Sequence, residues 1–174
     1  MDRRRWSLVV PLVATLLVVA DQVSKRIVTT ALREGQSVEF ARWLAPVFHI
    51  TYVTNTGAAF GLFPNWGHLF VIVAVVVVTA LVWYYFQLSD GQWLVQIALG
   101  LQLGGAVGNL TDRLRHGFVV DFIDLNFWPL RTWPVFNLAD SSIVVGVTLL
   151  SCLMLWDEWH QQIERNPRKV TEGG

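Results

Sequence analysis

The sequence predicts an all-α membrane protein with four transmembrane helices, and three observations support this fold class. Hydrophobic residues make up 53% of the 174 residues and charged residues only 15%, whereas a soluble domain carries about 25% charged residues. Four segments are apolar over most of the roughly 20 residues that a helix needs to cross a bilayer. Tryptophans stand at the ends of these segments, as expected of side chains that prefer the membrane–water boundary.

The four apolar segments follow one another along the chain at residues 6–20, 66–86, 93–110 and 137–159. The tryptophans at their ends are Trp6, Trp66, Trp83, Trp93, Trp156 and Trp159. The first segment is short for a span, but Asp21, Ser24 and Lys25 follow at helical spacing, so we expect its helix to continue with a polar end at the interface. A secretory signal peptide is the alternative for this segment, because three arginines precede it and Val18-Val19-Ala20 resembles a cleavage site.

Four spans place both chain ends on the same side of the membrane, which we predict to be the cytoplasm. Arg3, Arg4 and Arg5 directly precede the first segment, and positively charged residues favour the cytoplasmic side. The opposite loops hold a similar number of basic residues, so the prediction follows the first helix, which usually dominates. Residues 1–160 then form a single domain with extracytoplasmic segments at about 31–65 and 111–136, and residues 161–174 form a polar cytoplasmic tail. The tail is expected to be disordered from His160 onward.

A short strand is predicted in the first extracytoplasmic segment. Phe48, Ile50 and Tyr52 alternate with His49, Thr51 and Val53, which is typical of a strand with two unlike faces. Asn55-Thr56-Gly57 then provides the turn residues that end it.

Most of the unusual polar residues fall on the outer side of the predicted spans. An ionisable group in the hydrocarbon region costs about 2.5–3.5 kcal/mol on insertion scales, so each such residue is a functional candidate. The candidates are Asp21 and Lys25 after the first segment, Asn55 before the second, Asn109, Asp112 and Arg113 after the third, Asp121 and Asp124 in the following loop, and Asn137 and Asp140 at the start of the fourth.

Several of these features also have a purely structural interpretation. Asp21 and Lys25 are four residues apart, so they can form a helix-end ion pair worth a few tenths of a kcal/mol. Gly100, Gly104 and Gly108, with Gly105 beside them, form a stripe that lets another helix approach closely; clearance for an extended substrate is its second interpretation. Asp112 and Arg113 can pair with each other, and Arg113 can equally hold a carbonyl group or a lipid head group.

Asp140 is the strongest candidate for chemistry. A carboxylate suits a helix N-terminus, so Asp140 could simply cap the fourth helix, although Ser141 could do so without a buried charge. Paired with a second carboxylate, Asp140 would share one proton, so that one group activates water and the other donates to a carbonyl oxygen. The spacing alone leaves Asp112, Asp121 and Asp124 open as the partner.

The chain closely resembles the lipoprotein signal peptidase family, the signal peptidase II aspartyl proteases of bacterial inner membranes. Five blocks carry the resemblance and lie in the family's order: D-Q-V-S-K at 21–25, N-T-G-A-A-F at 55–60, G-G-A-V-G-N-L-T-D-R at 104–113, V-V-D-F-I at 119–123 and F-N-L-A-D-S at 136–141. Each block alone is weakly specific, but together they are highly specific.

The resemblance implies a function and a set of site residues. The family's catalytic aspartates match Asp121 and Asp140, whereas Asp124 matches no catalytic position. Residues that line the family's site and hold the substrate match Asn55, Gly105, Asn109, Arg113 and Asn137, and supporting residues match Asp21, Lys25 and Asp112. The family also implies four transmembrane helices, cytoplasmic ends and a small extracytoplasmic β-strand layer.

The implied reaction is cleavage of a diacylglyceryl-modified prolipoprotein just before its lipidated cysteine. Prolipoprotein substrates and membrane lipid are therefore the expected partners, and a monomer is the expected state. No cofactor or metal is implied, and the four histidines (His49, His68, His116 and His160) are scattered along the sequence. The formal net charge is zero, so no basic surface for nucleic acid is predicted.

Two other function classes fit parts of the sequence. Intramembrane carboxylates also suit a small ion- or proton-coupled transporter, but transporters tend to carry such groups at the bilayer midplane and to contain internal repeats. A non-enzymatic assembly factor could use the glycine stripe to bind partner helices, but that function leaves the five polar blocks unexplained.

Overall fold

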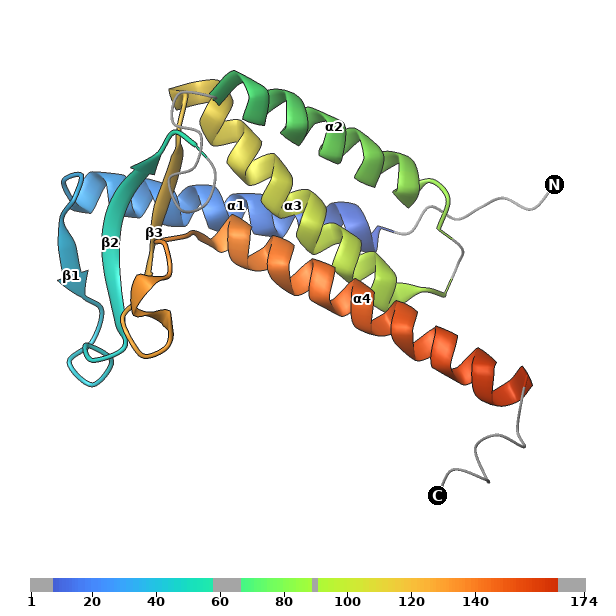
Figure 1. Ribbon diagram of the computed structural model, residues 1–174. Helices are drawn as coiled ribbons and strands as arrows, with labels where there is room; N and C mark the ends of the chain where they lie inside the picture. Colours follow the sequence, from blue (N-terminus) through green and yellow to red (C-terminus); the bar gives the residue numbers. More distant parts are fainter. Residues whose placement is uncertain (1–7, 58–66, 89–90, 166–174) are drawn as a thin grey trace.

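The computed structural model describes residues 8–57, 67–88 and 91–165. Four α-helices and three β-strands make up most of the described chain (Figure 1). The helices are α1 (Val9–Ala31), α2 (Gly67–Tyr85), α3 (Trp93–His116) and α4 (Leu138–Arg165); the strands are β1 (Ser37–Glu39), β2 (Phe48–Asn55) and β3 (Val119–Leu125); and a short 3-10 helix, η2, spans Leu130–Thr132. Trp6, Trp66, the arginines at 3–5, residues 58–60 of the second sequence block and the end of the tail lie outside the described residues.

Helix α3 forms the centre of the bundle, because it packs against the other three helices (Figure 1). The glycine stripe makes this packing possible. A Cβ atom on Gly104 would lie 2.9 Å from the carbonyl oxygen of Ala14 in α1, and a Cβ on Gly105 would collide with the carbonyl oxygen of Ala139 in α4. The same close approach occurs from the α4 side, because a Cβ atom on Gly146 would lie 2.7 Å from the carbonyl oxygen of Ala98 in α3. The stripe is therefore a helix-packing surface, which was the first of its two interpretations.

Three of the helices within the described part of the chain, α2, α3 and α4, are long and apolar enough to cross a membrane. Helix α1 is also 23 residues long, but charged residues occupy its second half. Trp83 and Trp93 lie at helix ends, whereas Trp156 and Trp159 lie within the last ten residues of α4; all four have exposed side chains.

The three strands form an antiparallel sheet in the order β1-β2-β3. Strand β2 confirms the predicted strand, and its pairing with β3 runs from Phe48 opposite Leu125 to Asn55 opposite Val119, with an irregularity between Ile50 and Val53. The sheet lies across the end of the bundle where α1 and α3 end and α4 begins (Figure 1). Since β3 follows α3 directly and leads into α4, the sheet places its residues beside the C-terminal end of α3 and the N-terminal end of α4.

Two helices extend further than the sequence predicted. Helix α3 continues past residue 110 to His116 and ends at Gly117, whose φ of 80° gives the left-handed conformation that commonly terminates helices. Helix α4 continues to Arg165, so residues 160–165 of the predicted disordered tail are helical. Glutamate, glutamine and arginine in this stretch are good helix formers, and the His160 ring packs against Trp156 in a tilted arrangement with centroids 4.5 Å apart. Hydropathy marked the end of the apolar stretch, not the end of the helix.

Candidate active site

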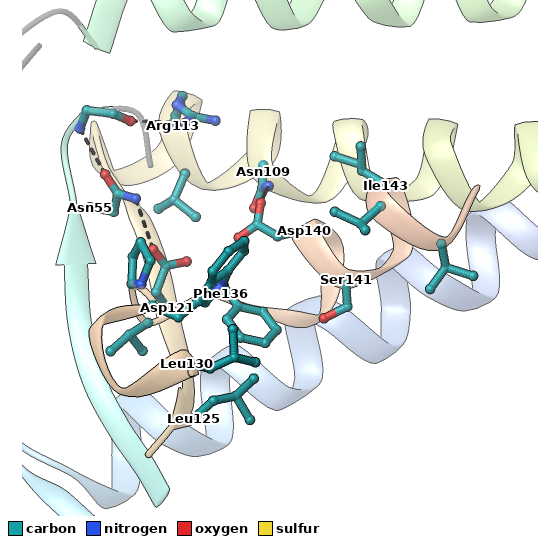
Figure 2. Close-up of a pocket in the computed structure, with 17 residues that line it drawn as sticks. Asn55, Asn109, Arg113, Asp121, Leu125, Leu130, Phe136, Asp140, Ser141 and Ile143 are labelled. Carbon is teal, nitrogen blue, oxygen red and sulfur yellow. Dashed lines mark hydrogen bonds between the residues drawn. The ribbon is translucent and has the colours of Figure 1, made fainter. Parts of the chain in front are cut away.

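A cavity of about 560 Å³ lies where the sheet meets the start of α4 (Figure 2). Both Asp121 and Asp140 line it. Asp121 comes from the middle of β3 and Asp140 from the first turn of α4, and Figure 2 shows their carboxyl groups turned toward the same space. Of the residues that the family resemblance assigned to substrate binding, the cavity lining includes Asn55, Asn109 and Arg113.

Two amide groups hold the carboxyl group of Asp121. Asn137 Nδ2 donates to Oδ1 over 2.6 Å, and Asn55 Nδ2 donates to Oδ2 over 3.0 Å. The side chain is almost completely buried. Burial and, next, the negative charge of Asp140 raise the pKa of Asp121 to about 7, against the opposing effect of the two amide hydrogen bonds. Asp121 can therefore carry a proton near neutral pH.

Asp140 is held by an amide and by the backbone. Asn109 Nδ2 donates to Oδ1 over 2.7 Å, and the backbone N–H of Asn137 donates to Oδ2 over 3.3 Å. In return, the backbone N–H of Asp140 donates to Asn137 Oδ1 over 2.9 Å. This reciprocal pair is a capping box, in which two otherwise unpaired donors of a helix start are satisfied. The capping interpretation of Asp140 is thus correct, and Asp140 lines the cavity as well.

Ser141 does not cap the helix, because its hydroxyl donates to the carbonyl oxygen of Asn137.

The amide of Asn109 connects the two carboxylates. Its Oδ1 accepts from Asn137 Nδ2 over 3.2 Å and from Lys25 Nζ over 3.0 Å. A continuous path of side-chain hydrogen bonds therefore runs from Asp121 through Asn137 and Asn109 to Asp140. Because Lys25 can only donate, it fixes which end of the Asn109 amide faces Asp140.

The supporting residues lie beneath the cavity in a buried cluster. Lys25 Nζ is 2.8 Å from Asp21 Oδ2 and 2.9 Å from Asp112 Oδ2, and all three side chains are at most 4% exposed. The predicted ion pair between Asp21 and Lys25 therefore forms, but it is buried in the protein interior and does not lie at an exposed helix end. A pair between Asp112 and Arg113 does not form, because Asp112 turns toward Lys25.

Arg113 reaches the cavity from α3. Its Nη2 is 3.5 Å from the carbonyl oxygen of Gly57, and its guanidinium carbon lies 5.5 Å from the centre of the Phe70 ring. Arg113 lines the cavity, and Figure 2 shows it near Asn55. A cation that contacts a backbone carbonyl in this way can hold an extended peptide.

Asp124 does not reach the cavity. Its Oδ2 accepts from Thr51 Oγ1 over 2.6 Å on the other face of the sheet. Gly105 does not reach it either, because its Cα faces the backbone of α4. Among the described residues, no three His, Cys, Asp or Glu side chains gather in the way that a metal site requires.

Sequence reasoning missed two groups of residues. Part of the apolar cavity lining comes from the loop between β3 and α4 and includes Leu130, Trp133 and Phe136. The signal was a set of large apolar side chains in a loop that holds two prolines and a single charged residue, Arg131. Gln22 was also missed, although its Nε2 donates to Asp112 Oδ1 over 2.8 Å and lies 3.3 Å from Asp21 Oδ2.

Comparison with known proteins agrees with this geometry. A family profile described as "Signal peptidase (SPase) II" matches residues 13–156. The lipoprotein signal peptidase of Halothermothrix orenii is 43% identical over 84% of this chain and 94% of its own length. That of Moorella thermoacetica is 45% identical over 83% of this chain and 91% of its own length.

Solved structures are similar as well. A bacterial membrane enzyme determined by the in meso method at 2.3 Å resolution aligns with a TM-score of 0.79 and 35% identity, over 91% of this chain and 94% of that one. A second such structure, at 1.9 Å resolution, aligns with a TM-score of 0.74 and 34% identity, over 89% and 97%. The profile match and the identity with these relatives place the chain in the signal peptidase II family, the lipoprotein signal peptidases.

Proposed function

We propose that this chain removes the signal peptide from diacylglyceryl-modified prolipoproteins by aspartic endopeptidase chemistry, cleaving just before the lipidated cysteine. Membership of the signal peptidase II family supports the substrate class and the reaction. One observation carries the assignment of the catalytic residues: Asp121 and Asp140 line one cavity, and a path of two amides joins them.

In the proposed mechanism, the two aspartates share one proton. The pKa of Asp121, raised to about 7, makes Asp121 the holder of this proton and the general acid. Asp140, as a carboxylate, takes a proton from the attacking water, while Asp121 gives its proton to the oxygen of the scissile carbonyl. The tetrahedral diol then collapses: Asp121 regains a proton from one hydroxyl, and the departing amine takes the proton that Asp140 received.

The shape of the cavity suits a lipid-modified peptide. Leu125, Leu130 and Trp133 give it an apolar wall, which continues onto Val144 and Val145 of α4. These two valines are 63% and 55% exposed on a helix apolar enough to cross a membrane. An acyl chain can therefore remain in lipid beside α4 while the peptide bond to be cut lies next to Asp121 and Asp140.

We also propose that α1 spans the membrane, which completes four transmembrane helices in one protease domain at residues 1–160. Its exposed apolar side chains form one stripe: Leu12, Leu16, Val19, Val23 and Ile27. Two of its charged residues, Asp21 and Lys25, face inward, so they do not meet hydrocarbon, and the third, Arg26, is exposed near the end of the helix beside the sheet. At about 1.5 Å per residue, a helix of this length is sufficient for the roughly 30 Å of a bilayer core.

The proposed topology follows from the same arrangement. Helix α1 begins, and α4 ends, at the end of the bundle opposite the sheet (Figure 1). With both chain termini in the cytoplasm, the sheet and the cavity face the outer side of a bacterial inner membrane. Substrate signal helices and membrane lipid are then the partners, and a monomer contains the whole site.

The test is cleavage of a lipidated precursor by purified full-length protein in detergent, followed on a gel. Asp121→Asn and Asp140→Asn should each remain folded and lose turnover. Asp124→Asn is the matched control, because Asp124 belongs to the same strand as Asp121 but bonds with Thr51 instead; it should keep most of the activity. Near-normal turnover in either of the first two variants would show that the catalytic pair is wrongly assigned.

A further inference from the structure

We infer that Asp21, Lys25 and Asp112 form a clamp that sets the positions of Asp121 and Asp140 through the backbone. This inference rests on the proposed function, because it takes these two aspartates as the catalytic pair. The three residues are called the Lys25 clamp below.

Each carboxylate of the clamp accepts a hydrogen bond from the residue that precedes a catalytic aspartate. Asp21 Oδ1 accepts from the backbone N–H of Ala139 over 3.1 Å, and Asp112 Oδ2 accepts from the backbone N–H of Val120 over 3.2 Å. Asp21 thus ties α1 to the first turn of α4, and Asp112 ties α3 to β3. The two contacts are equivalent although the four residues come from four different elements.

Lys25 fixes the two carboxylates relative to each other. Its ammonium group has three donors, and three acceptors surround it: Asp21 at 2.8 Å, Asp112 at 2.9 Å and Asn109 at 3.0 Å. The third contact orients the amide that donates to Asp140. One nitrogen atom therefore lies at the centre of the contacts that hold both catalytic residues.

The residue types follow from this arrangement. Asp21 uses one oxygen for Lys25 and the other for Ala139, and an asparagine could satisfy only one of these two donors. Asp112 uses a single oxygen for both Lys25 and Val120, while its second oxygen accepts from Gln22. An asparagine at position 112 could keep the first oxygen and would lose only the contact with Gln22. The clamp therefore predicts a larger effect for Asp21→Asn than for Asp112→Asn.

Stability alone does not explain the cluster. Burying charges is costly, and apolar residues of similar size often give equal or greater stability than a buried ion pair. The surrounding helices nevertheless leave space for it: a Cβ on Gly108 would lie 2.7 Å from Asp21 Oδ2. The contacts at Ala139 and Val120 provide the positional role that a packed apolar cluster could not.

The first experiment compares Asp21→Asn and Asp112→Asn with Leu99→Ala in the full-length protein. Leu99 is buried in α3 and does not belong to the clamp, so Leu99→Ala should lower the unfolding temperature without changing kcat. We expect Asp21→Asn to lower the maximal kcat by roughly 100-fold, the effect of about 1 Å of misplacement, and Asp112→Asn by roughly 10-fold. KM should stay nearly constant in both variants, because Asn55 and Arg113 are untouched. Cleavage is measured across pH, with thermal unfolding in the same detergent.

Three outcomes would overturn the inference. A lower unfolding temperature with normal kcat would make the clamp purely structural. A displaced pH profile with an unchanged maximum would mean that it acts only through its charge. A raised KM with normal kcat would place its effect on substrate binding.

A second measurement needs no variant and no catalysis. The first amides of a helix have no partner within it, so Ala139 should exchange its amide hydrogen quickly unless Asp21 holds it. The clamp predicts slow exchange at both Ala139 and Val120 in the wild-type protein, measured by NMR in detergent micelles. Fast exchange at either amide overturns the clamp, even if the variants do not fold. Amide hydrogen exchange is measured without any cleavage reaction. The result therefore tests the clamp independently of whether Asp121 and Asp140 are the catalytic pair.

Discussion

Asn137 and Asp140 hydrogen-bond with each other in both directions across the first turn of α4. The Asp140 backbone N–H donates to Asn137 Oδ1 over 2.9 Å, and the Asn137 backbone N–H donates to Asp140 Oδ2 over 3.3 Å. Because Asn137 Oδ1 is used in this cap, its Nδ2 is free to point the other way and reaches Asp121. The helix cap therefore orients the donor that links the two proposed catalytic groups.

This dual role of Asn137 can be separated by substitution. Asn137→Ser should keep the cap, because serine is a good N-cap residue, whereas Asn137→Ala should lose about 0.5–2 kcal/mol of stability. Both variants lose the donor to Asp121, which becomes a carboxylate when it gives its proton to the substrate, and a hydrogen bond to a charged group is worth about 1.5–3 kcal/mol. We expect both to lower kcat by roughly 10- to 100-fold. Thermal unfolding and precursor cleavage measure the two effects, and normal activity in Asn137→Ser would mean that the donor is dispensable.

The fold followed from the sequence where a local pattern determined the structure. The apolar segments located α2, α3 and α4, and the alternation from Phe48 onward located β2. Strand β1 is only three residues long and has no pattern of its own. The cluster around Lys25 joins α1 to α3, and a pairing between residues so distant in sequence depends on helix packing that local periodicity does not contain.

A local sequence pattern could have distinguished Asp121 from Asp124 as the partner of Asp140. The two residues are three positions apart on β3, so they project to opposite faces of the sheet. Asp121 shares its face with Leu125, another residue of the cavity, while Asp124 meets Thr51. Had V-V-D-F-I-D-L been interpreted as a strand, its period of two would have separated the candidates without the family resemblance.

The pH dependence of the reaction should report the protonated aspartate. With the pKa of Asp121 raised to about 7, the general acid loses its proton above neutral pH, so kcat/KM should fall about tenfold for each further pH unit. The inflection belongs to the coupled pair and not to one residue alone. Precursor cleavage at saturating and at limiting substrate, from about pH 5 to about pH 9, measures this inflection. A rate that rises through pH 7 and stays high would reverse the roles of the two aspartates.

Stability should depend on pH through the same group. The pKa of Asp121 is about 7 in the folded protein against an ordinary value of 3.8, so between these values the folded state binds the proton more tightly than the unfolded chain. The free energy of unfolding must then fall as pH rises through this window and level off above it. At about 1.4 kcal/mol per pKa unit, the loss amounts to at most roughly 4 kcal/mol.

Asp121→Asn removes this dependence, because asparagine does not titrate. Its unfolding temperature should rise relative to that of the wild type as pH increases from about 4 to about 7. Any change in hydrogen bonding caused by the amide is constant over this range, so the slope of the difference is the quantity to measure. Parallel curves for the two proteins would show that Asp121 is not held in its protonated form.

Arg113 should contribute to binding more than to the chemical step. It lines the cavity and contacts the carbonyl oxygen of Gly57, and no hydrogen bond or ion pair within the described residues joins it to Asp121 or Asp140. Arg113→Met should therefore raise KM and leave kcat close to normal, which is the signature of lost uniform binding. Steady-state kinetics with lipidated precursor decides the point: a fall in kcat at constant KM would instead give Arg113 a role in the transition state.

A substitution at Gly105 distinguishes the two interpretations of the glycine stripe, helix packing and clearance for an extended substrate. A Cβ at this position would meet the carbonyl oxygen of Ala139, the hydroxyl of Ser142 at 2.5 Å and the side chain of Ile143. Relief requires α3 and α4 to move apart, and overpacking of this kind typically costs about 1–3 kcal/mol. Gly105→Ala should therefore lower the unfolding temperature, together with activity, because Asp140 follows Ala139 directly. Gly67→Ala is the matched control, since its Cβ would lie at an ordinary 3.4 Å from the Gly117 carbonyl oxygen, and it should leave both properties unchanged. If Gly105→Ala kept its stability and lost only substrate affinity, the stripe would serve substrate clearance and not helix packing.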